Sequence, residues 1–502
     1  MPAEMALQLR DVVFRYLENG KRNILDHTDL DVAAGTLTVI MGGSGCGKST
    51  LAAVAAGLYP ENGGYLQGGD FRLFGHDLQG LDPQKRAAYL TVLFQNPDLQ
   101  FCMDTLRAEM RFCLENICVP ACEIDKRIET AAAELQITDL LDRTLTTLSG
   151  GEKQKAALAC LYLLESRCIL LDECFANLDE AEAKRLLPML VKMKAEGRTL
   201  IAIDHKADLW LDYADEFILL QEGCHIAARG INKQNITQHR ADFDALGLFY
   251  PLAATPCHAK GKGKADNAPI LQFRGVSIRK GLPQKRKWKR AVYDTPFLLQ
   301  NADADFPAGA MTAVLGASGI GKTTTFLSVL KQHPYSGQIL LQGQDIAPSK
   351  PRELYRQIGI VFQNPANQFV TQNVEDEVCV GLRLWQPDLP EDACRSKAEE
   401  LLERYGLKRQ RKYSPYMLSQ GQQRRLAVLS VLAGGQKLLL LDEPTYGQDA
   451  KSVDAIMGHL RQKVEQEGLT VIFITHDKAL ARQWADKIYH MENAALTESE
   501  EP

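Results

Sequence analysis

The sequence predicts an α/β protein made of two copies of one domain, each with a core of apolar parallel β-strands. The segment FQNPDLQF at 94–101 returns as FQNPANQF at 362–369, 268 residues later. A glycine-rich turn between an apolar strand and a helix also occurs twice, at 42–49 and 316–323, and 502 residues exceed what one hydrophobic core usually spans. We therefore expect a first domain at 1–251, a linker at 252–269 and a second domain at 270–502.

The composition is that of an ordinary globular chain. It is 45% hydrophobic and 24% charged, with a formal net charge of −5, so overall charge gives no support to a nucleic-acid partner. We find no uninterrupted apolar run of 18 residues and no secretory leader pattern, and we expect a cytosolic chain.

The cysteines are read as free thiols. Ten of the 12 precede residue 260 and no CxxC pair occurs. The irregular spacing of Cys102, Cys113, Cys118 and Cys122 favours free cytosolic thiols over a metal or iron–sulfur site.

The two glycine-rich turns predict phosphate-binding loops. GGSGCGKS at 42–49 and GASGIGKT at 316–323 fit GxxxxGK[ST], and each follows an apolar strand and opens a helix. Backbone amides and the helix N-terminus attract phosphate, Lys48 and Lys322 reach its terminal groups, and Ser49 and Thr323 offer a hydroxyl to Mg²⁺. The nucleotide contacts expected here are Gly42, Gly43, Ser44, Gly45, Cys46, Gly47, Lys48, Ser49 and Thr50, and Gly316, Ala317, Ser318, Gly319, Ile320, Gly321, Lys322, Thr323 and Thr324.

Two further strands in each copy end in polar residues. The runs RCILLDE (167–173) and KLLLLDE (437–443) are apolar enough for buried parallel strands. Asp172 and Asp442 are expected to bind Mg²⁺, while Glu173 and Glu443 polarise the attacking water. The strands TLIAIDH (199–205) and TVIFITH (470–476) end in His205 and His476, expected to sense the γ-phosphate because their spacing of 271 residues follows the other repeats.

The segments LSGGEKQK (148–155) and LSQGQQRR (418–425) complete a family pattern. With the phosphate loops, acidic strand ends and histidines, they resemble the ATP-binding cassette (ABC) ATPase family over nearly the whole chain, twice. The resemblance implies two P-loop cassettes, each with a mixed or parallel β-sheet core and an α-helical subdomain. It also implies a head-to-tail pseudo-dimer in which the signature of one cassette closes over ATP held by the other. The signature residues expected to contact nucleotide are Ser149, Gly150 and Gly151, and Ser419, Gln420 and Gly421.

The chain departs from the family pattern at a few positions. Gln420 replaces a signature glycine, Glu152 a glutamine, and Cys174 the proline that the second copy keeps as Pro444. None removes a lysine, glutamate or histidine that the chemistry needs, so we predict two hydrolytically competent sites of unequal rate.

The adenine contact differs between the copies. Tyr16 stands where the family stacks an aromatic ring on the base, and Lys280 takes this place in the second copy. Trp288 or Tyr293 is one possible substitute; a solvated strand end is the other reading.

The repeated FQNP segment extends the resemblance. In the family, Gln95 and Gln363 would contact metal and attacking water and begin the segment that leads to a membrane partner. FQNPxxQ, with YGQD (446–449) and FANLD (175–179) as loops whose Asp449 and Asp179 would interact across the dimer, is similar to the ATPases of energy-coupling-factor (ECF) importers of vitamins and transition metals. This implies an integral membrane scaffold and a substrate-binding membrane protein as partners, with the chain peripheral on the cytoplasmic face.

Two rival functions stay open at this point. One is a soluble tandem cassette acting on ribosomes or nucleic acid, for which the basic run 279–290 is the only support; the other is an exporter ATPase. The ATPase residues do not identify the substrate. Residues 226–250 have no match in the second copy; they are expected to form a plain surface helix, or else to brace the dimer.

Overall fold

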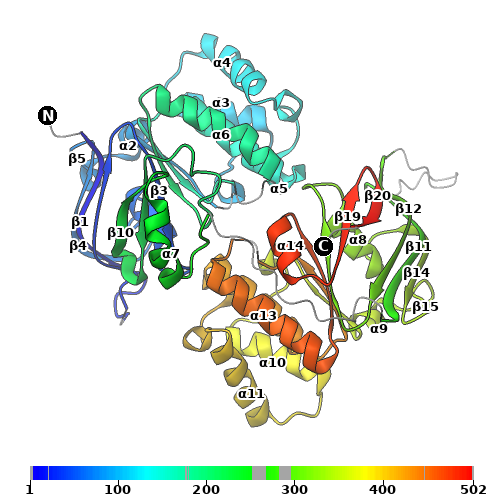
Figure 1. The fold of residues 1–502 in the computed structure, drawn as a ribbon. Coiled ribbons are helices and arrows are strands. Elements are labelled where there is room, and N and C mark those ends of the chain that lie inside the picture. Colours follow the sequence, from blue (N-terminus) through cyan, green and yellow to red (C-terminus); the bar gives the residue numbers. More distant parts are fainter. Residues whose placement is uncertain are drawn as a thin grey trace. The chain divides into compact units, whose positions relative to one another are not determined.

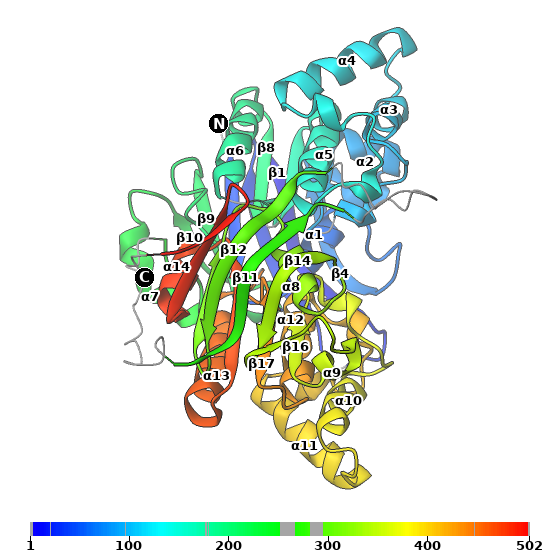
Figure 2. The ribbon, with the colours of Figure 1, turned by 90° about the vertical axis from the view of Figure 1, so that its right-hand side faces the viewer.

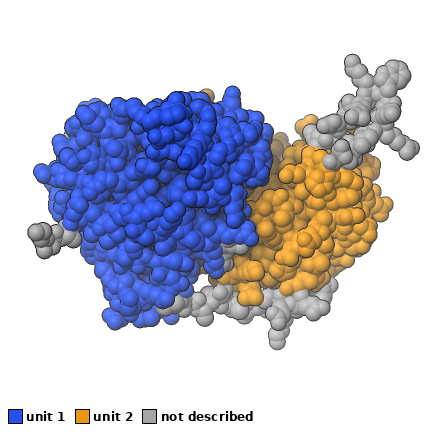
Figure 3. Space-filling model, turned by 90° about the horizontal axis from the view of Figure 1, so that it is seen from above, with its two compact units in different colours: residues 1–253, 447–451 blue, residues 254–446, 452–502 orange. Residues whose placement is uncertain are grey.

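The computed structural model describes residues 4–20, 22–95, 97–175, 178, 180–251, 267–281, 295–445 and 447–499. Its contacts divide the chain into two compact units, which Figure 3 shows in different colours. Unit 1 comprises residues 1–253 and 447–451, and unit 2 comprises residues 254–446 and 452–502. Each unit is described by itself.

Unit 1 is built on a six-stranded sheet in the order β10-β9-β3-β8-β7-β6. The five strands from β9 to β6 run parallel, and β10 pairs antiparallel with β9. Central strands β3, β7 and β8 are wholly buried, as the apolar runs predict. The strands are β3 (Leu37–Gly42), β6 (Leu90–Leu93), β7 (Cys168–Asp172), β8 (Thr199–Ile203), β9 (Glu216–Leu220) and β10 (Ile226–Ile231).

A second, antiparallel sheet in unit 1 has the order β2-β1-β4-β5. Its strands are β1 (Met5–Arg15), β2 (Leu25–Ala33), β4 (Tyr65–Leu73) and β5 (His76–Asp77). Helix α1 (Lys48–Ala55) shares one buried core with both sheets, in which Leu51 packs with Phe14 and Ile201. The helix that follows the first phosphate loop is therefore fixed by apolar packing on two sides.

The remaining helices of unit 1 form a subdomain and a cover for the parallel sheet. Helices α3, α4 and α5 gather at one end of the unit, drawn in cyan to green in Figure 1, around a core of their own. Helix α6 packs on the parallel sheet. The helices are α2 (Pro83–Tyr89), α3 (Leu106–Asn116), α4 (Ala121–Glu134), α5 (Gly150–Leu163), α6 (Glu180–Ala195) and α7 (Arg240–Leu246).

Unit 2 repeats this architecture. Its parallel sheet has the order β16-β17-β18-β13-β19-β20, with β20 antiparallel, and its antiparallel sheet, in front in Figure 2, has the order β12-β11-β14-β15. The strands are β11 (Pro269–Arg279), β12 (Phe297–Pro307), β13 (Met311–Leu315), β14 (Tyr335–Leu341), β15 (Gln344–Asp345), β16 (Ile358–Val361), β17 (Leu438–Asp442), β18 (Thr470–Thr475), β19 (Lys487–Glu492) and β20 (Ala495–Glu498). The helices are α8 (Lys322–Val329), α9 (Pro351–Tyr355), α10 (Val374–Trp385), α11 (Glu391–Arg404), α12 (Gln420–Leu432), α13 (Ala450–Glu467) and α14 (Lys478–Trp484).

Residues 226–250 differ from the expectation in two ways. Strand β10 does have a counterpart in the second copy, because β20 pairs with β19 as β10 pairs with β9. Helix α7 is no plain surface helix either, since Phe243 is fully buried and Leu248 nearly so in the core that also holds Trp210. The sequence reading missed this because the apolar positions fall in a helix of only seven residues.

No helix within the described ranges combines the length and apolar character needed to span a bilayer.

Candidate functional site

Both phosphate loops end in a glycine that the backbone requires. Gly47 and Gly321 cap helices α1 and α8 with φ of 113° and 107°. A Cβ at Gly47 would lie 2.8 Å from Cys224 Sγ, and one at Gly321 would lie 2.8 Å from Leu298 Cβ. The positive φ and these close neighbours leave room only for glycine.

The loop lysines are buried and held by their own loops. Lys48 Nζ donates to the carbonyls of Gly42 (2.7 Å) and Gly43 (3.1 Å). Lys322 Nζ donates to the carbonyls of Gly316 (2.6 Å) and Ala317 (2.8 Å). Each ammonium therefore lies inside the curl of backbone that precedes its helix N-terminus, where an anion is favoured.

A hydroxyl and a carboxylate meet beside each loop. Thr323 Oγ1 donates to Asp442 Oδ2 at 2.5 Å. Burial raises the pKa of Asp442 to about 6, although the hydrogen bond from Thr323 works to lower this pKa. In unit 1, burial and then the charge of Glu173 raise the pKa of Asp172 to about 7, although the hydrogen bond from Ser49 opposes this.

The glutamate after each acidic strand end has a special backbone conformation. Glu173 and Glu443 both have φ of 51°. Their amides donate to Ile203 O (2.9 Å) and Ile474 O (3.1 Å) of the neighbouring strand. This left-handed conformation is uncommon for a residue other than glycine, and it is typical of positions whose side chain must be aimed.

In unit 1, buried Glu173 contacts buried His205 and half-buried Gln95. His205 Nε2 lies 2.9 Å from Glu173 Oε1, and Gln95 Nε2 donates to Glu173 Oε2. Burial opposes ionisation of Glu173, but the charge and hydrogen bond of His205 hold its pKa below the ordinary value. The structure thus brings together three residues that the sequence singled out separately.

The cluster in unit 2 is only partly the same. His476 Nδ1 lies 2.9 Å from Glu443 Oε1, so the second histidine uses its other ring nitrogen. The side chain of Gln363 is exposed and forms no hydrogen bond to Glu443 or to any other described residue. The side chains of Gln95 and Gln363 therefore make different contacts in the structure.

The backbone of Gln363 is held by a residue that the sequence reading missed. Buried Arg424 donates to the carbonyl of Gln363 (2.8 Å), and its charge works to lower the pKa of Asp442. The corresponding residue in unit 1 is the uncharged Gln154. A comparison of the two signature segments could have found Arg424, because an arginine in one copy replaces an uncharged glutamine in the other.

A second missed residue is Asp204, which directly precedes His205. Its Oδ1 accepts from the amide of His205 (2.7 Å), and its Oδ2 accepts from Trp210 Nε1 (2.8 Å). Burial raises the pKa of Asp204. The carboxylate fixes the backbone that carries the histidine, and Thr475 takes its place in unit 2.

The two signature serines begin helices in the same way. Ser149 and Ser419 cap α5 and α12, accepting from the amides of Glu152 and Gln422 at 3.3 Å. The Ser149 amide in turn donates to Glu152 Oε2 (2.7 Å), and the Ser419 amide donates to Gln422 Oε1 (3.1 Å). Glu152 therefore preserves the helix start that the usual glutamine would supply. Gly150, Gly151, Gln420 and Gly421 form the first turns of these helices.

The adenine contacts differ between the units. Tyr16 Oη lies 2.7 Å from Thr50 Oγ1 on α1, and 47% of Tyr16 is exposed, with its ring packed edge-on against Phe14 and Tyr59. In unit 2, Lys280 donates its amide to Pro296 O (3.0 Å), and the Arg279 guanidinium lies 3.7 Å from the centre of the Phe297 ring. Trp288 and Tyr293 lie outside the described residues, as do Asp179 and most of the basic run 279–290.

Each site offers oxygen ligands that suit Mg²⁺. Asp172 Oδ1 is buried and has no hydrogen-bond partner in the described part of the chain. An ionised carboxylate oxygen beside a serine or threonine hydroxyl matches the ligands that Mg²⁺ takes together with phosphate oxygens and water. Within the described ranges no group of three or more histidine, cysteine or acidic side chains forms a metal cage, and Cys102, Cys113, Cys118 and Cys122 are free thiols.

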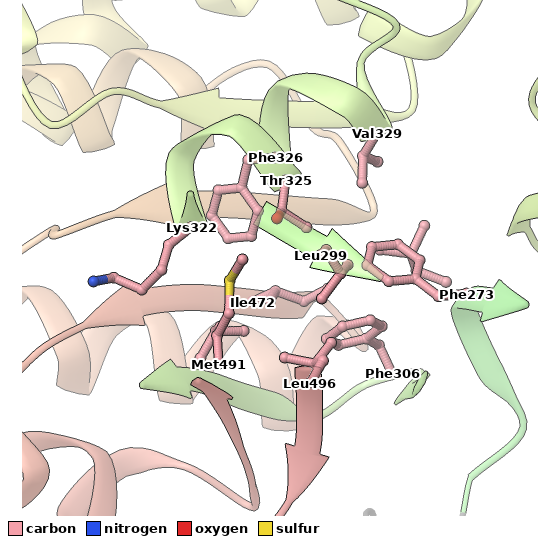
Figure 4. Close-up of a pocket in the computed structure, with 12 residues that line it drawn as sticks. Phe273, Leu299, Phe306, Lys322, Thr325, Phe326, Val329, Ile472, Met491 and Leu496 are labelled. Carbon is pink, nitrogen blue, oxygen red and sulfur yellow. The ribbon is translucent and has the colours of Figure 1, made fainter. Parts of the chain in front are cut away.

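Unit 2 also contains a small internal cavity. It measures about 10 Å³ and is lined almost entirely by apolar side chains of α8 and both sheets. Figure 4 shows Phe273, Phe306 and Phe326 around it, while the amine of Lys322 points away. This is a packing defect of the core beside the phosphate loop.

Among known proteins, one family matches both halves of the chain. The family described as "ABC transporter" matches residues 25–176 and 299–446. A Bacillus subtilis (strain 168) protein, provisionally named HMP/thiamine import ATP-binding protein YkoD, is 33% identical over 98% of this chain and 90% of its own length. An ABC transporter ATP-binding protein of Methanosarcina acetivorans, also provisionally named, is 32% identical over 98% of this chain and 85% of its own length.

Solved structures agree on the fold. An archaeal ABCE1 bound to the ribosome with Pelota superposes with a TM-score of 0.67 at 18% identity, covering 97% of this chain and 77% of that one. At this identity the likeness concerns the fold alone. It covers residues of both units.

Proposed function

Because the chain belongs to the ABC transporter family and carries its ATP-hydrolysing cassette twice, we propose that it is the ATPase of an ECF-type importer. The observation that carries this proposal is the 33% identity over 98% of the chain with a relative named for HMP/thiamine import. The repeated FQNP segment supports it as well. A thiamine-type vitamin is the first substrate to test, followed by other vitamins, cobalt and nickel.

In this proposal the residues of each site have separate tasks. Lys48 and Lys322 bind the terminal phosphates of ATP. Ser49 with Asp172, and Thr323 with Asp442, would hold Mg²⁺, which supplies charge stabilisation for the phosphates. The Asp172 and Asp442 carboxylates ionise fully when a cation is bound, since a cation offsets the cost of burying their charge.

Glu173 and Glu443 polarise the attacking water, and the contacting histidines orient them. A carboxylate held by an imidazole at 2.9 Å is suited to receive a proton from water. Gln95 reaches Glu173 directly, whereas Gln363 would have to move to do the same. This difference supports two competent sites of unequal rate.

Transport further requires that the two cassettes close on ATP. We propose the head-to-tail arrangement of the family, in which Ser419 and Gly421 complete the site of Lys48, and Ser149 and Gly151 complete the site of Lys322. Helix N-termini capped by serine present amides that suit the γ-phosphate. Closure would push a membrane scaffold, and hydrolysis would release it.

The proposed partners are an integral membrane scaffold and a separate substrate-binding membrane protein. The chain would then lie on the cytoplasmic face of the membrane through these partners. Copurification from detergent-solubilised membranes tests this: two integral proteins and a retained vitamin or metal are expected. Recovery of the chain with no integral membrane protein, under conditions that preserve ATPase activity, would refute the proposal.

The ribosome or nucleic-acid alternative has weaker support. Its fold likeness comes from relatives under 25% identical, and the net charge is −5. ATPase activity that rises with added RNA or ribosomes and falls steeply with salt would favour it. An exporter would instead be recognised by ATP-dependent loss of substrate from loaded cells.

A further inference from the structure

The segment that begins at each repeated glutamine is held differently in the two units. In unit 2, buried Arg424 of α12 donates from Nη2 to Gln363 O (2.8 Å). Gln368, further along the same segment, donates from Nε2 to Ala427 O (3.1 Å), also on α12. Two hydrogen bonds, one at each end of the segment 363–368, therefore join it to this helix.

The matching segment of unit 1 makes a different set of contacts. Gln100 Nε2 donates to Val92 O (2.8 Å) of strand β6 and so bonds to the segment's own strand. Asp98 pairs with Lys153 of α5 (2.6 Å), but the Asp98 side chain is 55% exposed, and exposed ion pairs hold a segment weakly. Gln154, at the place of Arg424, carries no charge. The charged donor that holds the segment of unit 2 is therefore not repeated at this position of unit 1.

The glutamine side chains differ in the same way as the segments. Gln95 is half-buried and donates to Glu173 Oε2, whereas Gln363 is exposed and makes no such bond to Glu443 in the described part of the chain. A hydrogen bond from a guanidinium is stronger than one between neutral groups. The bond from Arg424 can therefore fix the main chain from which the Gln363 side chain starts.

Arg424 also brings a positive charge close to an expected Mg²⁺ ligand. Burial raises the pKa of Asp442, and the charge of Arg424 is among the effects that oppose this rise. A cation bound at the Asp442 carboxylate would feel the same charge as repulsion. Gln154 brings no charge to the corresponding place in unit 1, so this repulsion belongs to unit 2.

We propose that Arg424 is a positioning residue that slows ATP hydrolysis in unit 2 by holding Gln363 away from Glu443, and that uncharged Gln154 leaves unit 1 as the faster site. This rests on the two competent sites proposed above. It names the residue that makes their rates unequal and says which site is slower.

The test measures hydrolysis by each unit in the full chain, with both glutamates intact. Azido-ATP, Mg²⁺ and orthovanadate are added, and ADP is trapped where ATP has been hydrolysed because vanadate takes the place of the released phosphate. After illumination, mass spectrometry compares the initial rates at which peptides from 1–251 and from 270–502 are labelled. In the parent chain, peptides from 1–251 should be labelled at least about threefold faster.

Two variants remove Arg424 in different ways. R424Q installs the residue of unit 1, and R424M keeps most of the side-chain length without its charge or donors. Both should raise the labelling rate of 270–502 about threefold and leave that of 1–251 within about twofold, since Gln363 can then turn toward Glu443. Adding Q363A to R424Q should remove this gain, which a merely structural role for Arg424 does not predict.

The Mg²⁺ requirement gives a separate measure of the charge of Arg424. The Mg²⁺ concentration that gives half-maximal labelling of 270–502 should fall about threefold in R424Q. It should stay at the parent value in R424K, which keeps the positive charge. A fall of the same size in R424K would contradict the part assigned to charge.

R425Q is the matched control on the same helix. Arg425 donates to Tyr405 O (3.2 Å), so R425Q should keep both labelling rates within about twofold of the parent values. Equal labelling of the two halves in the parent chain would overturn the inference. So would R424Q and R424M chains that label 270–502 no faster than the parent, or a gain that survives Q363A. Each of these results leaves the importer function standing, because copurification with membrane proteins tests that function separately.

Discussion

At the scale of single residues, both sites place a carboxylate where its charge is unfavourable. Asp172 and Asp442 end buried strands, and burial raises the pKa of both, to about 7 and about 6. A raised pKa means that the folded chain binds the proton more tightly than the unfolded chain. Between the ordinary pKa of 3.8 and the folded value, stability therefore falls as pH rises.

This predicts a pH dependence that one substitution removes. Without nucleotide and Mg²⁺, D172N should raise the free energy of unfolding of unit 1 by about 1–4 kcal/mol at pH 7.5 and by much less near pH 4. Urea unfolding followed by Trp210 fluorescence, with Trp288, Trp385 and Trp484 changed to Phe, measures unit 1. D442N, in a chain whose only tryptophan is Trp484, should raise the free energy of unfolding of unit 2 by a smaller amount. If D172N left the pH dependence of the free energy of unfolding unchanged, the raised pKa would be wrongly assigned to Asp172.

At the scale of elements, most of the site could be read from the sequence because each functional residue ends a strand or begins a helix. Apolar runs fix β3, β7, β8 and their counterparts, and parallel pairing brings their carboxyl ends together. Glu173 therefore lies beside His205, with 2.9 Å between Oε1 and Nε2. The position of Gln363 could not be read in this way, because it depends on Arg424, a side chain from a distant helix.

Helix α7 is a second element whose contacts the sequence did not predict, and its burial can be tested. Phe243 is fully buried between residues of the parallel-sheet core and contacts the ring of Tyr250 edge-on. Phe243→Ala should lower the free energy of unfolding of unit 1 by about 3–5 kcal/mol, because it removes a large apolar side chain and leaves a cavity. Exposed Arg240→Ala, measured with the same Trp210 reporter, should change it by under about 0.5 kcal/mol. A Phe243→Ala chain as stable as the parent would restore the surface-helix reading.

At the scale of the whole molecule, the two units share one architecture but differ in detail. Arg424 takes the place of Gln154, and His476 contacts its glutamate through a different ring nitrogen from His205. The repeat predicts the shared scaffold well because backbone geometry follows glycines and apolar periodicity. It predicts the differences less well, since single substitutions at matched positions change the contacts but not the pattern.

The head-to-tail arrangement is tested by changing the signature serine of one unit and measuring nucleotide labelling of the other. Ser419→Arg should lower azido-ATP labelling of peptides from residues 1–251 more than about tenfold, since a bulky cation would replace the capping hydroxyl near the γ-phosphate of the Lys48 site. Labelling of residues 270–502 should stay within about twofold, and Ser149→Arg should give the reverse result. Mass spectrometry of the labelled peptides measures which site holds nucleotide, and steady-state ATP turnover of E173Q and E443Q compares the rates of the two sites. A Ser419→Arg chain that loses labelling only within 270–502 would refute the arrangement.

The uneven placement of cysteines has a practical consequence. Cys102, Cys118 and Cys122 are exposed on the helical subdomain of unit 1, whereas Cys379 and Cys394 of unit 2 are buried. Among the described residues, a maleimide dye would thus mark one half of the chain without any engineered thiol. A fluorophore on Cys102 would lie on the segment that leads from Gln95 to α3, so its emission would report changes in the surroundings of that segment.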